Sequence, residues 1–441
     1  MNQSTKPRKT RSPWTWIPTL YFGQGIPYVV VMTVAVIMYK RFGLSNTDIA
    51  LYTSWLYLPW VIKPFWSPFV DILKTKRWWI VTMQLLIGAG LAGVAFTLPT
   101  PFYFKATLGF FWLLAFSSAT HDIAADGFYM LALNDSQQSF FVGIRSTFYR
   151  LAMIVGQGLL IILAGFLETS TGKVPLAWSI TFFVLAGLFI TLFVYHNFIL
   201  PKPISDQGKA AHSPADIAKE FGRTFASFFT KKGIGLAIAF MLIYRLAEAM
   251  LVKLASPFLL DLREIGGLGL STQEVGLVYG TVGVIALTLG GIIGGIVASQ
   301  KGLKYWLWPM ALSITLPNAA YLLLAYFQPE SFLWINAAVA VEQFGYGFGF
   351  TAYMLYLIYF SQGEHKTAHY SICTGFMALG MMLPGMISGW LQESVGYTTF
   401  FVIIMIATIP TLLLVPFLKV DPEFGKGTKK EKKVPQIKTK V

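Results

Sequence analysis

Apolar stretches of about 20 residues, the length that crosses a bilayer as a helix, recur along most of the chain. These stretches are continuous and do not alternate in segments of about ten residues, so they indicate helices and not the strands of a membrane barrel. We therefore predict an all-α membrane protein with twelve transmembrane helices. The predicted spans are residues 14–39, 47–70, 78–99, 106–133, 140–167, 176–199, 233–260, 272–299, 305–327, 332–361, 368–393 and 397–418. An even number of spans places both chain ends on the same side of the membrane.

The longest polar interruption follows the sixth predicted span and divides the chain into two halves. Inside it, Phe225 and Phe228 continue a helical spacing that begins at Ile217 and Phe221, with charged residues between them. This pattern predicts an amphipathic helix at the membrane surface. The expected organisation is a basic tail at 1–13, a six-helix half at 14–200, a cytoplasmic linker at 201–232, a second six-helix half at 233–418 and a basic tail at 419–441.

A short repeat supports this division. Gly43–Ile49 reads Gly-Leu-Ser-x-x-Asp-Ile, and Gly269–Val275 reads Gly-Leu-Ser-x-x-Glu-Val at the same place in the second half. Each copy precedes a span and resembles a capping box, in which the serine oxygen accepts a hydrogen bond from a free amide at the helix start. Two similar six-helix halves joined by a linker form the major facilitator architecture, whose substrate site lies at the midplane between the halves.

Composition and charge agree with this class. The chain is 55% hydrophobic and 12% charged, against about 25% charged residues in ordinary soluble domains. Its net charge of +14 is concentrated in the two tails and the predicted inward loops, which favours cytoplasmic termini and argues against nucleic acid as a partner. The predicted outward loops hold only Lys40, Arg41, Lys105, Lys173 and Arg263. The single Cys373 can form no internal disulfide.

Ionisable residues inside the spans are the candidates for function, because a charge in the bilayer needs a partner, water or a role. The fourth span carries His121, Asp122 and Asp126. The two aspartates are spaced i, i+4 and share one helical face, so mutual repulsion and burial favour protonation of one of them. We expect these three residues to couple transport to protons. The alternative is that they pair with cations of the fifth span and hold the helices together.

Several basic residues also fall inside spans. Arg150 lies deep in the fifth span and could pair with an acid of the fourth span or bind a substrate anion, whereas Arg145 is expected to reach the membrane surface. Arg245 and Glu248 in the seventh span are spaced i, i+3, which allows a local ion pair, either structural or part of a gate. Arg245 is also, with Arg150, a candidate to bind a substrate carboxylate. Lys253 is expected to extend to the surface.

Two further spans offer candidate sites. Glu342 is a lone acid in the tenth span and is followed by several glycines, so it is a further candidate proton carrier. The first span is interrupted by Pro18 and Pro27, which predicts an irregular helix that can expose polar groups to a cavity. Gln24 and Tyr28 on this span are therefore candidate substrate contacts.

A third group of residues is a candidate gate. Lys63 and Asp71 flank a Trp-Ser-Pro segment that leads into a basic loop, a pattern that resembles the conformational latch of major facilitators. His365 and His369 are spaced i, i+4 but lack the glutamate of a metalloprotease motif, so we expect no metal site. We expect no other cofactor, and with no phosphate-binding loop in the sequence, an ion gradient is the expected energy source.

Together these motifs resemble the bacterial muropeptide permeases of the AmpG type, a branch of the major facilitators that also contains acetyl-CoA transporters and some siderophore permeases. The likeness extends roughly from Gly23 to Trp390. The segments that carry it are Lys63 to Asp71, Ser118-Ala119-x-x-Asp122-Ile123-x-x-Asp126, Tyr149-Arg150-Leu151-x-Met153, Tyr244 to Glu248, Gly269 to Gly276, and Glu342 with the glycines that follow it.

The resemblance implies a proton-coupled importer of cell-wall fragments in the bacterial inner membrane, acting as a monomer on a small-molecule substrate. The family commonly has Gln and Lys where this chain has His121 and Arg245, so a smaller sugar such as N-acetylmuramic acid is an alternative to an anhydro-muropeptide. Siderophores and acetyl-CoA-like solutes are further alternatives within the family. A receptor that senses cell-wall fragments and a membrane-embedded enzyme are alternatives from other classes, although no nucleophile stands at a recognisable spacing from a base.

Overall fold

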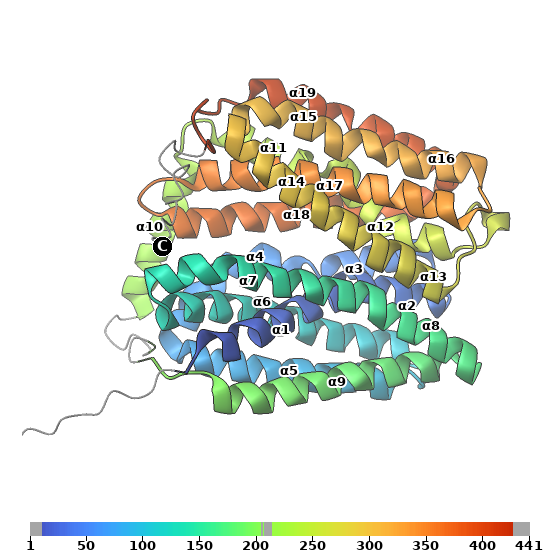
Figure 1. Ribbon diagram of the computed structural model, residues 1–441, viewed down its shortest axis with the longest axis horizontal. Helices are drawn as coiled ribbons and strands as arrows, with labels where there is room; N and C mark the ends of the chain where they lie inside the picture. Colours follow the sequence, from blue (N-terminus) through green and yellow to red (C-terminus); the bar gives the residue numbers. More distant parts are fainter. Residues whose placement is uncertain (1–10, 204–205, 207–213, 427–441) are drawn as a thin grey trace, which may run out of the picture.

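The computed structural model describes residues 11–203, 206 and 214–426, and every regular element in these residues is a helix. Most helices run side by side along the long axis of the molecule (Figure 1). The blue to green helices α1–α9 fill the lower part of this view, and the yellow to red helices α11–α19 fill the upper part. We refer to these two groups as the first half and the second half.

The first half contains α1 (Ile17–Val29), α2 (Ala35–Arg41), α3 (Asn46–Trp55), α4 (Leu58–Leu73), α5 (Lys76–Thr97), α6 (Tyr103–Ala132), α7 (Asp135–Ile154), α8 (Leu160–Thr171) and α9 (Val174–Ile199). The second half contains α11 (Ile234–Ile243), α12 (Leu246–Leu260), α13 (Thr272–Val275), α14 (Val284–Lys301), α15 (Leu303–Thr315), α16 (Ala319–Phe327), α17 (Phe332–Ser361), α18 (Lys366–Ala407) and α19 (Ile409–Leu414). Wider π-helical turns join helices at Val30–Val34, Val155–Leu159 and Gly276–Gly283, and tighter 3₁₀ turns lie at Pro13–Thr15, Arg263–Ile265, Leu316–Asn318 and Val415–Phe417.

Among the described residues, eight helical segments are long and apolar enough to cross a membrane. They are Pro13–Arg41, Lys76–Thr97, Ser136–Thr171, Val174–Ile199, Ile234–Leu260, Thr272–Lys301, Leu303–Phe327 and Lys366–Phe417. The last of these covers two predicted spans, and the chain turns between them at Gly396, whose φ of 77° lies in the left-handed region. The predicted irregularity of the first span is also present, because α1 contains Pro27 and passes directly into a π-helical turn.

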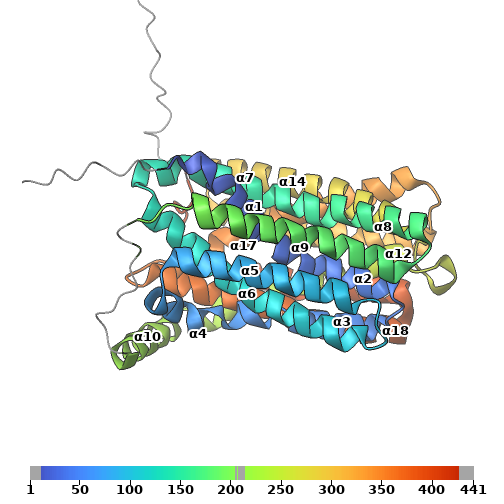
Figure 2. The same cartoon turned by 90° about the horizontal axis from the view of Figure 1, so that it is seen from below.

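The linker predicted between the halves contains α10 (Pro214–Phe229), which lies at one end of the bundle (Figure 2). The ring of Phe225 contacts Phe65 of α4 in the first half, at 5.3 Å between centroids. The ring of Phe228 is buried and stacks on Phe376 of α18 in the second half, at 6.2 Å. The helix therefore contacts both halves through aromatic side chains.

Both copies of the repeated Gly-Leu-Ser segment start a helix. Ser45 accepts a hydrogen bond from the amide of Asp48 at the start of α3. Ser271 does the same with Glu274 at the start of α13, and the Glu274 carboxylate accepts a hydrogen bond from the Ser271 amide in return. The helix capping predicted from the sequence is confirmed at these two serines.

Glycines allow close approach where helices of the two halves meet. α3 and α4 pack along α18, and α8 packs against α13. A Cβ on Gly389 of α18 would overlap the carbonyl oxygen of Asn46, and a Cβ on Gly165 of α8 would lie 2.6 Å from the amide nitrogen of Gln273. Any larger residue would force the two halves apart at these points.

We expect Gly389→Ala to lower the stability of the folded protein by about 1–3 kcal/mol, because the added methyl group has no room beside Asn46. The measurement is the melting temperature in detergent. Gly187→Ala in α9 is the matched control, since a Cβ there meets no atom within 4 Å. Equal melting temperatures for the two variants would contradict the close packing of α3 on α18.

Candidate functional site

Asp122 of α6 is held by two residues of α4. Trp60 Nε1 donates a hydrogen bond to Asp122 Oδ2 at 3.2 Å, and Lys63 Nζ lies 3.8 Å from the same oxygen. Lys63 was predicted to act with Asp71 in a latch, but the structure brings it to Asp122. Asp71 belongs to α4, and its side chain lies outside the part of the chain that the structure describes.

Asp126, one helical turn further along α6, pairs with Arg145 of α7. The shortest distance between the two side chains is 3.5 Å, and Arg145 also donates to the hydroxyl of Tyr21 at 3.1 Å. The guanidinium lies over the rings of Tyr21 and Tyr129, at 4.8 and 5.0 Å from their centroids. The Asp126 side chain is 44% exposed, so this pair remains accessible to solutes.

Arg145, and not Arg150, is thus the cation of α7 that meets an α6 acid. Arg145 was expected to extend to the membrane surface, and in the structure its guanidinium lies beside Asp126. Arg150 instead donates a hydrogen bond to the carbonyl oxygen of Thr288 in α14, at 3.2 Å. Arg150 therefore contacts the second half through a backbone carbonyl group, which carries no charge.

Arg245 stands where the seventh predicted span breaks into α11 and α12. Its guanidinium donates to the hydroxyl of Tyr346 and lies over the rings of Tyr346 and Phe350, at 5.2 and 4.7 Å from their centroids. Arg245 is the N-cap residue of α12 and has the non-helical dihedrals φ −108° and ψ 16°. No ion pair within 4.0 Å joins Arg245 to Glu248 in the described structure, so the local pair allowed by the sequence does not form.

Gln24 and Tyr28 lie one turn apart on α1 and are buried or half-buried. The ring of Tyr28 packs edge-on against Trp60, at 5.4 Å between centroids, and so lies next to the Asp122 cluster. Gln24 Oε1 is buried with no hydrogen-bond partner among the described residues. A buried amide oxygen of this kind is available to a ligand.

Glu248 and Glu342 are buried in the second half, at 2% and 1% exposure. Glu342 accepts one hydrogen bond, from Gln343 Nε2 at 2.9 Å. Both carboxylate oxygens of Glu248 and Oε1 of Glu342 are without partners in the described part of the protein. These are the least satisfied of the predicted site residues.

His121 has different surroundings from its neighbour Asp122. It joins a buried chain of hydrogen bonds in which Gln84 Nε2 and His121 Nε2 are 3.1 Å apart, and Gln84 Oε1 and His196 Nδ1 are 2.9 Å apart. His196 Nε2 continues the chain to Thr19 Oγ1 at 2.9 Å. Because the Gln84 side-chain amide lies between the two imidazoles, each ring can be neutral and still make its hydrogen bond to Gln84. The hydrogen-bonded chain links α1, α5, α6 and α9.

Lys253 of α12 does not extend to the membrane surface, which corrects the expectation from its position near the end of a span. It is buried, and its ammonium donates to Thr53 Oγ1 of the first half at 3.0 Å. The same ammonium lies over the ring of Tyr57 at 5.6 Å. Because Thr53 and Tyr57 of the first half bind the ammonium group inside the bundle, the Lys253 side chain does not extend to water.

Further polar contacts close the end of the bundle opposite α10 (Figure 1). Asp261 of the second half accepts from Lys40 at 2.6 Å and from the Tyr397 hydroxyl at 2.6 Å. Glu393 of α18 accepts from the backbone amide of Asn46, at 2.7 Å, and so binds the start of α3 across the interface. The Asn46 side chain also donates to Asp261, at 3.3 Å.

Glu168 of α8, in the first half, makes the corresponding contact with the second half. Its carboxylate accepts from Thr272 Oγ1 at the start of α13, at 2.8 Å, and from Trp178 Nε1 at 2.7 Å. Arg41 Nη2 lies 3.0 Å from the same carboxylate. We call the contacts of Asp261, Glu393 and Glu168 with the opposite half the distal seal. Sequence reasoning missed these acids because they stand at span ends, where charges are common.

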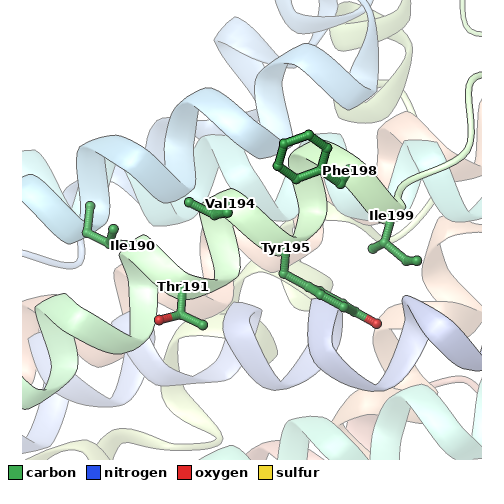
Figure 3. A pocket seen from close by; sticks show the side chains of 6 residues that line it. All are labelled: Ile190, Thr191, Val194, Tyr195, Phe198 and Ile199. Carbon is green, nitrogen blue, oxygen red and sulfur yellow. The ribbon is translucent and has the colours of Figure 1, made fainter.

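A hollow on the outside of the bundle is unrelated to these groups. It lies along α9 and is lined by Ile190, Thr191, Val194, Tyr195, Phe198 and Ile199 (Figure 3). Its almost entirely apolar lining on an outward helix face suits lipid chains and offers no group for chemistry.

Two groups of long apolar helices, with charged side chains placed between and within them, define a multi-pass membrane transporter. The chain belongs to the Major Facilitator Superfamily, whose sequence profile it matches over residues 19–362. It is 26% identical to a Rickettsia conorii protein that carries the name AmpG 4, over 89% of this chain and 93% of the relative. It is also 26% identical to the anhydromuropeptide permease of Escherichia coli, over 80% of this chain and 69% of the relative. These relatives confirm the resemblance to AmpG-type permeases.

A solved structure shows the same fold. A POT family transporter in complex with 5-aminolevulinic acid superposes with a TM-score of 0.70 over 91% of this chain and 95% of that chain, at 12% identity. The all-helical major facilitator fold predicted from the sequence is therefore confirmed.

We expect Gln84→Leu to destabilise the first half, because it leaves both His121 and His196 without their shared partner. Each buried unsatisfied group costs about 1–3 kcal/mol. The measurement is the melting temperature in detergent, with Gln362→Leu at an exposed position as the control. If the two variants have the same melting temperature, the chain of hydrogen bonds does not stabilise the fold.

Proposed function

We propose that this chain imports cell-wall sugars or muropeptides across a bacterial inner membrane by proton-coupled alternating access. The observation that carries this proposal is the set of ionisable side chains inside the bundle of a chain whose relatives include a protein named as an anhydromuropeptide permease. Such groups are costly in a membrane and are kept where they bind a solute or an ion.

The topology that we propose has twelve spans, six in each half, with both termini in the cytoplasm and a monomer as the working unit. Besides the eight apolar segments, α3 with α4, α6 and α17 are long enough to cross, and the turn at Gly396 divides α18 into two spans. The linker with α10 and both basic tails then face the cytoplasm. The tails at 1–10 and 427–441 lie outside the described residues.

The substrate site that we propose lies between Arg150 and Arg245, with Gln24 and Tyr28 beside them. Neither arginine has an acid within ion-pair distance in the described structure, so each can bind a substrate carboxylate. The aromatic rings around Arg245 and at Tyr28 offer flat surfaces that suit sugar rings. This arrangement fits an acidic amino sugar or a muropeptide.

The proton carriers that we propose are Asp122, Asp126 and Glu342. Asp126 is accessible and pairs with Arg145 over 3.5 Å, which is a weak ion pair that a proton can break. The role predicted for His121 stays a prediction, and its contacts with Gln84 favour a positioning role that orients α6. Lys63 is placed to act with Asp122 in the gate proposed for Lys63, Asp71 and Glu248.

Asp126→Asn tests the proton-coupling role. We expect it to abolish uptake of labelled muropeptide in cells at normal expression, because the amide cannot exchange a proton or pair with Arg145. Glu423→Gln is the control, since Glu423 is an exposed acid at the end of the described chain. Uptake by Asp126→Asn at the wild-type level across the range of about pH 5 to 8 would remove Asp126 from the coupling role.

Alternating access requires that the distal seal opens during the cycle. In the described state the seal joins the halves at the end opposite α10, whereas Asp126 nearer the α10 end is accessible. We therefore assign this state to an inward-facing conformation that is closed toward the periplasm.

Glu393→Gln tests the role of the seal, because it removes the charge that binds the start of α3. The reporter is Ser54→Cys in a Cys373→Ala background, since Ser54 is buried beside Gly385 and has no hydrogen-bond partner in the described residues. A charge-assisted hydrogen bond contributes about 1.5–3 kcal/mol, so labelling by an impermeant maleimide from the periplasm should rise about tenfold or more. Unchanged labelling would show that Glu393 does not hold the seal closed.

A further inference from the structure

Lys253 of α12 is a buried cation without a counter-charge. Its side chain is 4% exposed, and among the described residues no carboxylate lies within 4.0 Å of its ammonium group. The ammonium donates a hydrogen bond to Thr53 Oγ1 at 3.0 Å and lies 5.6 Å from the centroid of the Tyr57 ring. Neither of these groups carries a negative charge, so the positive charge of Lys253 is buried at a cost that only an anion would offset in full.

A second polar group next to Lys253 has no partner. The Ser54 side chain is fully buried, and its Oγ makes no hydrogen bond to any described residue. A Cβ on Gly385 of α18 would lie 2.6 Å from Ser54 Oγ and 3.3 Å from Lys253 Cε. The two side chains therefore flank the same point of α18, where α3, α12 and α18 contact one another (Figure 1).

The hydroxyls of Thr53 and Ser54 differ in what they can still bind. Thr53 Oγ1 donates its proton to the carbonyl oxygen of Ile49 at 2.6 Å, so it serves Lys253 only as an acceptor. The proton of the Ser54 hydroxyl has no acceptor within the described residues. An ammonium without a counter-charge and a hydroxyl with a free proton both suit a carboxylate, which accepts hydrogen bonds at two oxygens.

The contact between Lys253 and Thr53 lies deeper in the bundle than the distal seal. Asp261 of the seal follows Lys253 by eight residues on α12, and Asn46 precedes Thr53 by seven residues on α3. At 3.6 residues per turn, each interval is about two helical turns. Asp261 and Asn46 are themselves joined by a hydrogen bond at 3.3 Å, so the two contacts follow one another along the same pair of helices.

Alternating access must break the hydrogen bond between Lys253 and Thr53, because α12 belongs to the second half and α3 to the first. When the seal opens, the ammonium and the hydroxyl of Ser54 move apart, and an acidic group of an incoming solute can enter between them. In the described state the halves are closed at this level, and the Thr53 oxygen occupies the hydrogen-bonding position of such an acid. Thr53 is therefore the group that replaces the acid when the solute has moved on.

We propose that Lys253 and Ser54 form an anion subsite, which binds a carboxylate of the solute while the halves close around it. The subsite rests on the proposed transport function and narrows the class of solute. Arg245, the other solute-binding cation of the second half, precedes Lys253 by eight residues, which is about 12 Å along a helix axis. Two cations so far apart require two acidic groups on one solute.

This requirement distinguishes between the two candidate solutes. N-acetylmuramic acid carries one carboxylate, which can bind Arg245 or Lys253 but not both. The peptide of a muropeptide carries more than one carboxylate on an extended chain, so one can bind Arg245 while another binds Lys253. The anion subsite therefore selects a muropeptide that retains its peptide over the amino sugar alone.

The test compares an anhydro-muropeptide whose peptide carboxylates are free with the same compound after these carboxylates are amidated. Right-side-out membrane vesicles that contain the full chain give the external concentration for half-maximal uptake of each labelled compound. Lys253→Met keeps the length of the side chain and removes its charge. We expect it to raise this concentration about tenfold or more for the free acid, because a charge-assisted hydrogen bond is lost, and to leave the amidated compound unchanged. Ser54→Ala should raise the value for the free acid by a smaller factor, about threefold or more.

Lys105→Met, at an exposed position at the start of α6, is the matched control and should behave as the wild type. Melting temperatures in detergent establish that each variant is folded. The anion subsite is overturned if Lys253→Met and Ser54→Ala keep the wild-type preference for the free acid, or weaken uptake of both compounds equally, as a purely structural role would. Uptake of N-acetylmuramic acid without uptake of the muropeptide would also refute the subsite but would leave the transport function in place. Absence of uptake of every compound by the wild type would refute the transport function itself.

Discussion

An ionised side chain inside an apolar helix bundle requires a counter-charge, hydrogen bonds or water, and this constraint organises the polar part of the structure. The first half meets the requirement with pairs, in which Asp122 lies near Lys63 and Asp126 near Arg145. The second half does not, because Glu248 and Glu342 have no cation of their own within ion-pair distance in the described residues. A buried carboxylate in this condition is costly to keep ionised.

The repeated Gly-Leu-Ser segment gives the two halves matching roles at the distal seal. It starts α3 and α13, and the first residue of each helix meets an acid of the opposite half, Glu393 or Glu168. At α3 the Glu393 carboxylate accepts from the Asn46 amide, which has no partner within the helix, and at α13 the Glu168 carboxylate accepts from the Thr272 hydroxyl. One short repeat therefore accounts for two contacts between the halves at the end opposite α10.

The long apolar stretches, the turn between the last two predicted spans, the helix in the linker and the serine caps could all be predicted, because each depends on local sequence. The partners of buried charges could not, since they depend on how helices are set against one another. Arg145 rather than Arg150 reaches Asp126, and Lys253 binds Thr53 across the interface. Arg245 directs its guanidinium to Tyr346 and makes no ion pair with Glu248 in the described structure, and nothing in their i, i+3 spacing indicates it. The candidate residues could be named from the sequence, but their partners required the structure.

Counterflow in liposomes tests the central claim most directly. The purified chain is reconstituted in vesicles loaded with unlabelled anhydro-muropeptide, and labelled ligand is added outside without any ion gradient. The account predicts transient accumulation of intact label, because buried sites between two moving halves exchange solute across the membrane. Binding without accumulation would indicate a receptor, and chemical change of the label would indicate an enzyme. Either of these results would contradict the account.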